Sequence, residues 1–143
     1  SPFLSDTTHD GLDVCLLSAA LTNPKYKSLI NKYFNKISDK KDSLTLLNTS
    51  FSIEGAYIYL PKSVTAEKPI EIMHFSTGKQ GDFFLQPRNL IIVEENAEVQ
   101  ILERHQSLSN HRPFTNSVTE IYAKDSSRID YYKIQKNNLC KHF

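Results

Sequence analysis

The chain has 143 residues, of which 39% are hydrophobic and 23% charged, and its formal net charge is +1. This composition is typical of one globular domain and excludes a disordered or fibrous chain. The scattered charges form no basic stripe, so we expect no nucleic-acid partner. No apolar run approaches the ~20 residues of a transmembrane helix, so we expect no membrane partner either.

The two cysteines also restrict the function. Cys15 and Cys140 stand at opposite ends of the chain and form neither a CxxC pair nor a disulfide framework. We therefore expect a reducing, cytoplasmic setting, with Cys15 an inert buried thiol in the apolar stretch DVCLL. Both ends of the chain read as internal sequence, which predicts a piece of a longer protein.

The first 43 residues are expected to form an N-terminal segment. A short strand is predicted at 14–17. Asn23 and Pro24 then begin a helix, because Asn caps free backbone N–H groups and Pro is tolerated in the first turn. Apolar residues recur with helical spacing from Tyr26 to Ile37, which predicts an amphipathic helix over about 23–37. The polar run at 38–43 ends it.

From about residue 44 the apolar spacing drops to two, which predicts strands and no second long helix. The alternating pairs are Ile58 and Leu60, Ile70 and Ile72, Ile91 and Val93, Val99 and Ile101, and Ile129 and Tyr131. Three prolines, at positions 61, 69 and 87, stand at the edges of these runs, where a missing N–H is tolerated.

The segment 90–103, LIIVEENAEVQILE, aligns without a gap with 120–133, EIYAKDSSRIDYYK, and more faintly with 57–72. Read alone it resembles a hairpin, yet its centre has no Asn-Gly, Asp-Gly or Gly turn. A small residue follows each polar centre: Val64, Ala97 and Ser127. A repeat near 30 residues indicates stacked units and favours a β-solenoid over 44–143. An antiparallel sandwich with chance similarity is the alternative.

Six ordered blocks resemble the SufB/SufD family of the SUF iron–sulfur cluster assembly system, and the SufD branch is the more similar. They are LNTSF (47–51), EGAYIYLPKSV (54–64), KPIEI (68–72), PRNLIIVEENAEVQILERH (87–105), FTNSVTEIY (114–122) and YYKIQ (131–135). The resemblance implies a mainly β fold, with the first rungs of a right-handed parallel β-helix after a short helical segment.

The resemblance also implies a non-catalytic scaffold that pairs with a SufB-like subunit and the ATPase SufC, or with a second copy of itself. It implies no cofactor on these residues, because the iron–sulfur cluster belongs to the parent complex. Two alternatives stay open: a carbohydrate-active β-helix enzyme, either a lyase or a hydrolase, and a purely structural solenoid.

Two residues are candidates for binding. His105 follows LER, where the SufB branch carries Cys, and a His there suits a soft-metal ligand. A surface histidine is favoured, because nearby His111 is not at a strong metal spacing, so we predict no metal site. Gln135 matches a glutamine inside the SufB β-helix, and either lines a path for sulfur or iron or is a buried, hydrogen-bonded amide, which we favour. Asn116 is expected to have a structural use at a corner.

Three further charged residues, Arg88, Glu103 and Glu120, could imitate an active site. No set of nucleophile, base and orienting group emerges around them, so we predict an outward, solvated face and no catalytic residue. His74 and Ser76 stand where the SufB branch has Arg and Asn. This difference argues against a SufB-like sulfur-transfer role.

Overall fold

The computed structural model describes residues 11–37, 41–52, 54–76, 84–107 and 114–136. Its helices are α1 (Leu17–Thr22), the 3-10 helix η1 (Pro24–Tyr26), α2 (Lys27–Tyr33) and α3 (Ser43–Phe51). Its strands are β1 (Asp13–Leu16), β2 (Ala56–Leu60), β3 (Ile70–Ser76), β4 (Phe84–Leu85), β5 (Arg88–Val93), β6 (Glu98–Ser107), β7 (Phe114–Thr115), β8 (Val118–Ala123) and β9 (Arg128–Lys136). Within these ranges no helix has the length and apolar character needed to cross a membrane.

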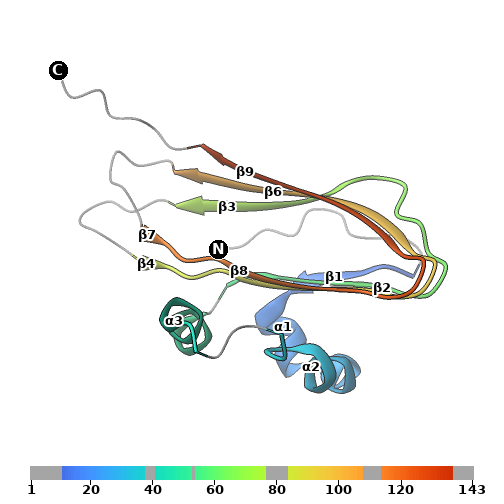
Figure 1. Ribbon diagram of the computed structural model, residues 1–143, viewed down its shortest axis with the longest axis horizontal. Coiled ribbons are helices and arrows are strands. Elements are labelled where there is room, and N and C mark those ends of the chain that lie inside the picture. The colour runs from blue at the N-terminus through green and yellow to red at the C-terminus, as the bar shows by residue number, and fades with distance from the viewer. Residues whose placement is uncertain (1–10, 38–40, 53, 77–83, 108–113, 137–143) are drawn as a thin grey trace.

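The strands form three sheets. Sheet A has the order β1-β2-β5-β8, in which β1 is antiparallel to β2 and the other pairs are parallel. Sheet B, β3-β6-β9, and the two-stranded sheet C, β4-β7, are parallel throughout. Figure 1 shows sheets A and B lying over one another, with α1 and α2 on the outer face of sheet A.

The strand register confirms the internal alignment of the sequence. Ile91 pairs with Ile121 between β5 and β8, and Val99 pairs with Ile129 between β6 and β9. The fainter upstream copy is confirmed as well, because Ile58 pairs with Ile91. Equivalent residues of successive repeats therefore lie side by side on neighbouring strands.

The corners between the strands of sheets A and B use left-handed backbone without glycine. Ser63, Asn96 and Ser126 have φ values of 62°, 56° and 57° at equivalent places. Asn is one of the residues that best tolerates this conformation, and Ser adopts it here too. The backbone N–H of Asn96 donates to the Asp125 carbonyl at 3.2 Å, so consecutive corners are hydrogen-bonded to each other. Ala97, which follows, is fully buried.

Two apolar clusters hold the layers together. The first lies between sheets A and B and includes Ile58, Ile91 and Ile101, all with 0% exposure. The second packs α1 and α2 on the opposite face of sheet A through residues such as Leu17 and Ile92. Sheet A is therefore buried on both faces and forms the middle layer.

The predicted fold class, a mainly β chain forming a right-handed parallel β-helix, is wrong. The described residues form a mixed α/β structure with separate sheets, one of them mixed. The physical reason is that Tyr57, Leu90 and Ile92 point away from the inter-sheet core and are covered by helices. Strands buried on both faces read as continuous apolar runs, which the two-residue periodicity does not reveal.

The N-terminal predictions are partly confirmed. The predicted strand at 14–17 is β1, and the Asn23 side chain accepts a hydrogen bond from the Lys25 N–H at 3.0 Å, as expected of a cap. The helix is shorter than predicted, because α2 ends at Tyr33. Helix α3 was not predicted; the Asp42 side chain caps it by accepting from the Thr45 N–H at 2.8 Å. The domain division at residue 43 stays a prediction.

Candidate functional site

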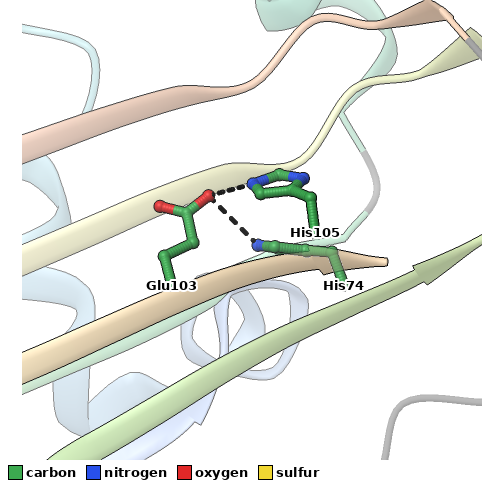
Figure 2. A group of neighbouring side chains, drawn as sticks. All are labelled: His74, Glu103 and His105. Atoms are coloured by element: carbon green, nitrogen blue, oxygen red, sulfur yellow. Dashed lines mark hydrogen bonds and ion pairs between the residues drawn. The ribbon is translucent and has the colours of Figure 1, made fainter. Parts of the chain in front are cut away.

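The candidate site lies on the inner face of sheet B, where β3 and β6 run side by side. The parallel register places His74 directly beside His105. Side chains two residues apart on a strand share a face, so Glu103 and His105 of β6 point to the same side. Figure 2 shows the three side chains converging, with both imidazoles directed at the carboxylate.

The atoms of this cluster are close enough to share one ligand. The Nε2 atom of His105 lies 2.5 Å from Oε1 of Glu103, and Nε2 of His74 lies 3.5 Å from the same oxygen. The two imidazole rings are stacked with centroids 4.5 Å apart. The Glu103 side chain is fully buried, whereas the His74 and His105 side chains are 15% and 12% exposed. The carboxylate is thus at the base of the cluster and the imidazoles are nearer to solvent.

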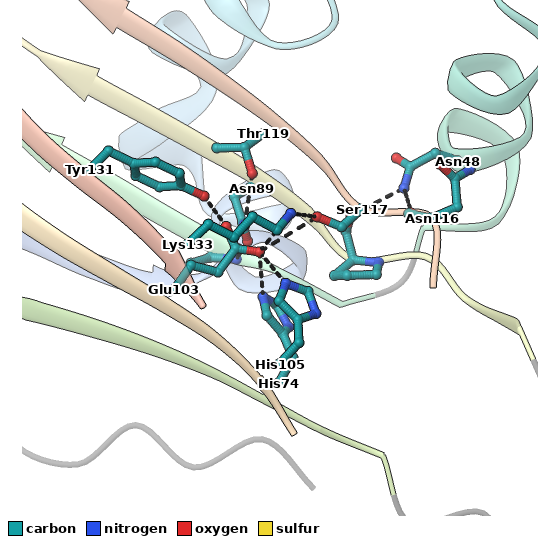
Figure 3. A network of polar contacts seen from close by, with 12 residues as sticks. Asn48, His74, Asn89, Glu103, His105, Asn116, Ser117, Thr119, Tyr131 and Lys133 are labelled. Carbon is teal, nitrogen blue, oxygen red and sulfur yellow. Dashed lines mark hydrogen bonds and ion pairs between the residues drawn. The ribbon is translucent and has the colours of Figure 1, made fainter. Parts of the chain in front are cut away.

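Further polar groups surround the Glu103 carboxylate (Figure 3). The hydroxyl of Tyr131 donates to Oε2, and the Ser117 hydroxyl lies 3.5 Å from Oε1. The Lys133 ammonium is 3.5 Å from Oε1 and donates to the Ser117 hydroxyl at 2.7 Å. Glu103 is therefore one acceptor facing several donors.

The charge of Glu103 follows from these contacts. Burial alone raises the pKa of the carboxyl, but hydrogen bonding by His105, the nearby His74 and the charge of Lys133 outweigh it. The net effect holds the pKa of Glu103 well below its ordinary range, so the group is a carboxylate at neutral pH. Imidazole nitrogens and a carboxylate oxygen are a ligand set that suits divalent transition metals.

A second buried charge network lies on the helix side of sheet A. Nη2 of Arg88 on β5 lies 3.0 Å from Oε2 of Glu120 on β8, and both side chains are almost fully buried. The backbone N–H groups of Asn35 and Lys36 donate to Glu120 at 2.9 and 3.1 Å. Arg88 also donates to the Thr49 hydroxyl at 2.8 Å. The pair thus ties the segment after α2, and α3, to the sheet.

The predicted solvated face is wrong for its three charged residues: Arg88 and Glu103 have 0% exposure, and Glu120 has 1%. Each has buried polar or charged partners from distant parts of the chain, which no local pattern indicates, although Glu103 also contacts His105 two residues away. Asn116 is used structurally, as expected, because its side chain donates to the Leu44 carbonyl at 2.6 Å.

The structure brings His105 to a second possible ligand that sequence reasoning missed. His74 was considered only for its difference from the SufB branch. A signal was present: IEIMHFS (70–76) and ILERHQS (101–107) share Ile, His and Ser at the same places. Extending the repeat to this strand would have paired the two histidines.

Gln135 pairs with His105 in the register of β6 and β9, but it is exposed, so its interpretation as a buried amide is wrong. Cys15 is a half-buried free thiol whose pKa is raised mainly by burial. His111 and Cys140 lie outside the described residues. Whether Gln135 or His105 binds a cofactor stays a prediction.

Comparison with known proteins extends over almost the whole chain. The SufBD protein N-terminal region matches residues 5–72, and the SufBD core domain of SUF system FeS cluster assembly matches residues 74–141. Two iron-sulfur cluster assembly SufBD family proteins of Synechocystis sp. are 26% and 28% identical, over 74% and 93% of this chain. The iron-sulfur cluster assembly protein SufD of Bacillus subtilis is 28% identical over 75% of it. The chain spans about a quarter of the length of these relatives, at 25%, 27% and 25%.

Proposed function

Because this chain belongs to the SufBD family, we propose that it acts in SUF iron–sulfur cluster assembly as a SufD-like, non-catalytic scaffold. In this role it pairs with a SufB-like subunit and a SufC-like ATPase, or with a second copy of itself. It works in the cytoplasm, and the cluster is the cargo of the complex.

One observation carries the proposal. Two family regions, N-terminal and core, match consecutive parts of the chain in order, at residues 5–72 and 74–141. A chance match would not be expected to continue from one region into the next. The similarity to SufD of Bacillus subtilis over 75% of the chain supports the SufD-like part of the proposal.

The described surface also favours a scaffold over a carbohydrate-active enzyme. Such an enzyme needs carboxylates gathered on one outward face, commonly as a pair. The outward residues of β6 and β9 instead alternate in type and contact one another. Gln100 lies 3.5 Å from Asp130, and Arg128 lies 3.3 Å from the same carboxylate. These exposed contacts resemble an ordinary solvated sheet face.

Affinity capture tests the proposal. The full-length protein is co-expressed with the SufB-like and SufC-like proteins of the same organism, and the complex is analysed by size-exclusion chromatography with light scattering. We expect a stable complex of defined stoichiometry. Capture of neither protein by a folded preparation would refute the scaffold role, and polysaccharide cleavage by that preparation would support the enzyme instead.

A further inference from the structure

We propose that His74, Glu103 and His105 form a binding site for one divalent first-row transition-metal cation on the inner face of sheet B. Each side chain offers one ligand atom, and the three atoms lie within 4.8 Å of one another. The identity of the cation as Fe²⁺ cargo rests on the proposed function. Binding of a metal as such does not.

The geometry is close to that of a bound ion. Zinc bonds to imidazole nitrogen and carboxylate oxygen are about 2.0–2.2 Å long, so two ligand atoms on one tetrahedral ion lie about 3.4 Å apart. Of the two distances from Oε1 of Glu103, the 3.5 Å to His74 is close to that value and the 2.5 Å to His105 is shorter. Side-chain rotations would open the contact to His105 and bring the two imidazole nitrogens, which lie within 4.8 Å of each other, together around an ion.

His74 supplies an independent indication of a missing partner. Its Nε2 atom is buried and makes no hydrogen bond within the described part of the protein. The contact of 3.5 Å to Glu103 is too long for an ordinary N–H···O bond. Buried polar atoms are normally satisfied, so this nitrogen points to a ligand between the two histidines and the carboxylate.

The surrounding groups are those expected around a metal ligand. The hydroxyls of Tyr131 and Ser117 contact the Glu103 carboxylate and fix its orientation, as outer groups do in metal sites. Lys133 disfavours the binding of a cation, because its positively charged ammonium lies 3.5 Å from Oε1. Its side chain is 33% exposed, so it can withdraw from the carboxylate towards solvent. We therefore infer that metal and ammonium compete for this oxygen.

The number of ligands suits a cation that is passed on. Three protein ligands leave open coordination positions, as in catalytic zinc sites and in non-haem iron sites with two histidines and one carboxylate. A metal ion in such a site can bind a further ligand from a partner protein while it keeps its three ligands from this chain. If the chain works in iron–sulfur assembly, Fe²⁺ held in this way is a substrate of that process rather than a resident cofactor.

Metal titration of the full-length protein tests the inference, with a purification tag that contains no histidine. After chelation and buffer exchange, Co²⁺ is added anaerobically and its visible absorption is followed, and Zn²⁺ binding is measured by calorimetry. We expect one ion at this site, lost in H74A and weakened on the order of tenfold or more in H105A. Q106A and E98Q, exposed positions on the same strand, are the matched controls.

K133M is the variant that separates a metal site from a merely structural cluster. Removing the competing ammonium should tighten metal binding on the order of tenfold, because a like charge near the ion is lost. A general loss of structure would weaken binding instead. Wild-type protein that binds neither Co²⁺ nor Zn²⁺, or H74A and H105A variants that bind as tightly as wild type, would overturn the inference.

These outcomes are distinguishable from failure of the proposed function. Metal binding is measured on the protein without partners, whereas the scaffold role is measured by capture. A complex that assembles but whose subunit binds no metal refutes the site alone. A subunit that binds metal but captures no partner refutes the scaffold role and leaves the site standing.

Discussion

The protein buries two carboxylates in different surroundings. Glu120 lies on the helix side of sheet A, and Glu103 lies between sheets A and B. On the helix side, Glu120 faces one guanidinium, Arg88, and its remaining acceptor positions receive backbone N–H groups of Asn35 and Lys36. Between the sheets, Glu103 faces two imidazoles, an ammonium and two hydroxyls. In the first network, one negative charge faces one positive charge. The second has more donors than one carboxylate can satisfy.

This difference separates a structural network from a site that can exchange partners. Arg88 and Glu120 connect β5 and β8 with the segment after α2, and both side chains are almost fully buried. Glu103 holds groups that are partly exposed, and one of them, His74, is incompletely bonded. A buried charge with a fixed partner stabilises one conformation, whereas a carboxylate with surplus donors can release one of them to a ligand.

The largest effect that this comparison predicts is that of R88M. Removing the guanidinium leaves Glu120 as a buried charge without its partner, which we expect to lower the free energy of unfolding by about 3–5 kcal/mol. Urea unfolding followed by circular dichroism measures it. R128M, at an exposed pair, should cost less than about 1 kcal/mol. An R88M cost as small as that of R128M would show that the Arg88–Glu120 pair is not structural.

A smaller effect is expected for E103Q. We expect a cost of about 1–2 kcal/mol, because the two histidines are partly exposed and Lys133 can turn towards solvent once the carboxylate is gone. E120Q is the matched comparison, since it removes the charge opposite a fully buried Arg88 and should cost more. If E103Q and E120Q lowered the free energy of unfolding equally in parallel urea experiments, both carboxylates would be structural and the proposed difference between them would be wrong.

The sequence predicted the strand positions well because the repeat is carried by apolar residues at fixed places. The pairs of Ile91 with Ile121 and Val99 with Ile129 are evident from the alignment alone. The layering was mispredicted, because Tyr57 and Leu90 give no sign of whether solvent or a helix covers them. The apolar residues of these strands suggested a solenoid core, but some of them are apolar because α1 and α2 pack against sheet A.

The buried charges could not be predicted, for a different reason. Arg88 and Glu120 are 32 residues apart and become partners only through the register of β5 and β8 and the placement of the segment after α2. The His74–His105 pair was accessible, because both stand four residues after an equivalent Ile in aligned strands. Glu103 joined them through strand alternation. Its other partners come from later in the chain: Tyr131 and Lys133 lie on β9, and Ser117 lies between β7 and β8.

The smallest predicted effect tests the premise behind the inference from His74, namely that an unpaired buried polar group is unfavourable in this fold. Tyr57 has 0% exposure, and its hydroxyl has no hydrogen-bond partner within the described residues. Y57F should therefore raise the free energy of unfolding by up to about 1 kcal/mol. The matched variant Y122F should lower it by about 1 kcal/mol, because the Tyr122 hydroxyl donates to the Tyr33 carbonyl at 2.6 Å.

The difference in the free energy of unfolding between wild type and Y57F should also depend on pH. Burial, followed by the nearby charge of Asp13, raises the pKa of Tyr57 above its ordinary value of 10.0. Above pH 10.0 the Tyr57 hydroxyl loses its proton in the unfolded chain more readily than in the folded one. The free energy of unfolding should therefore fall as pH rises. Y57F should remove this part of the alkaline loss in urea unfolding at pH 9 and 11. A Y57F variant that is less stable than wild type at both pH values would show that the hydroxyl is satisfied, and would remove the premise that an unpaired His74 nitrogen marks a ligand.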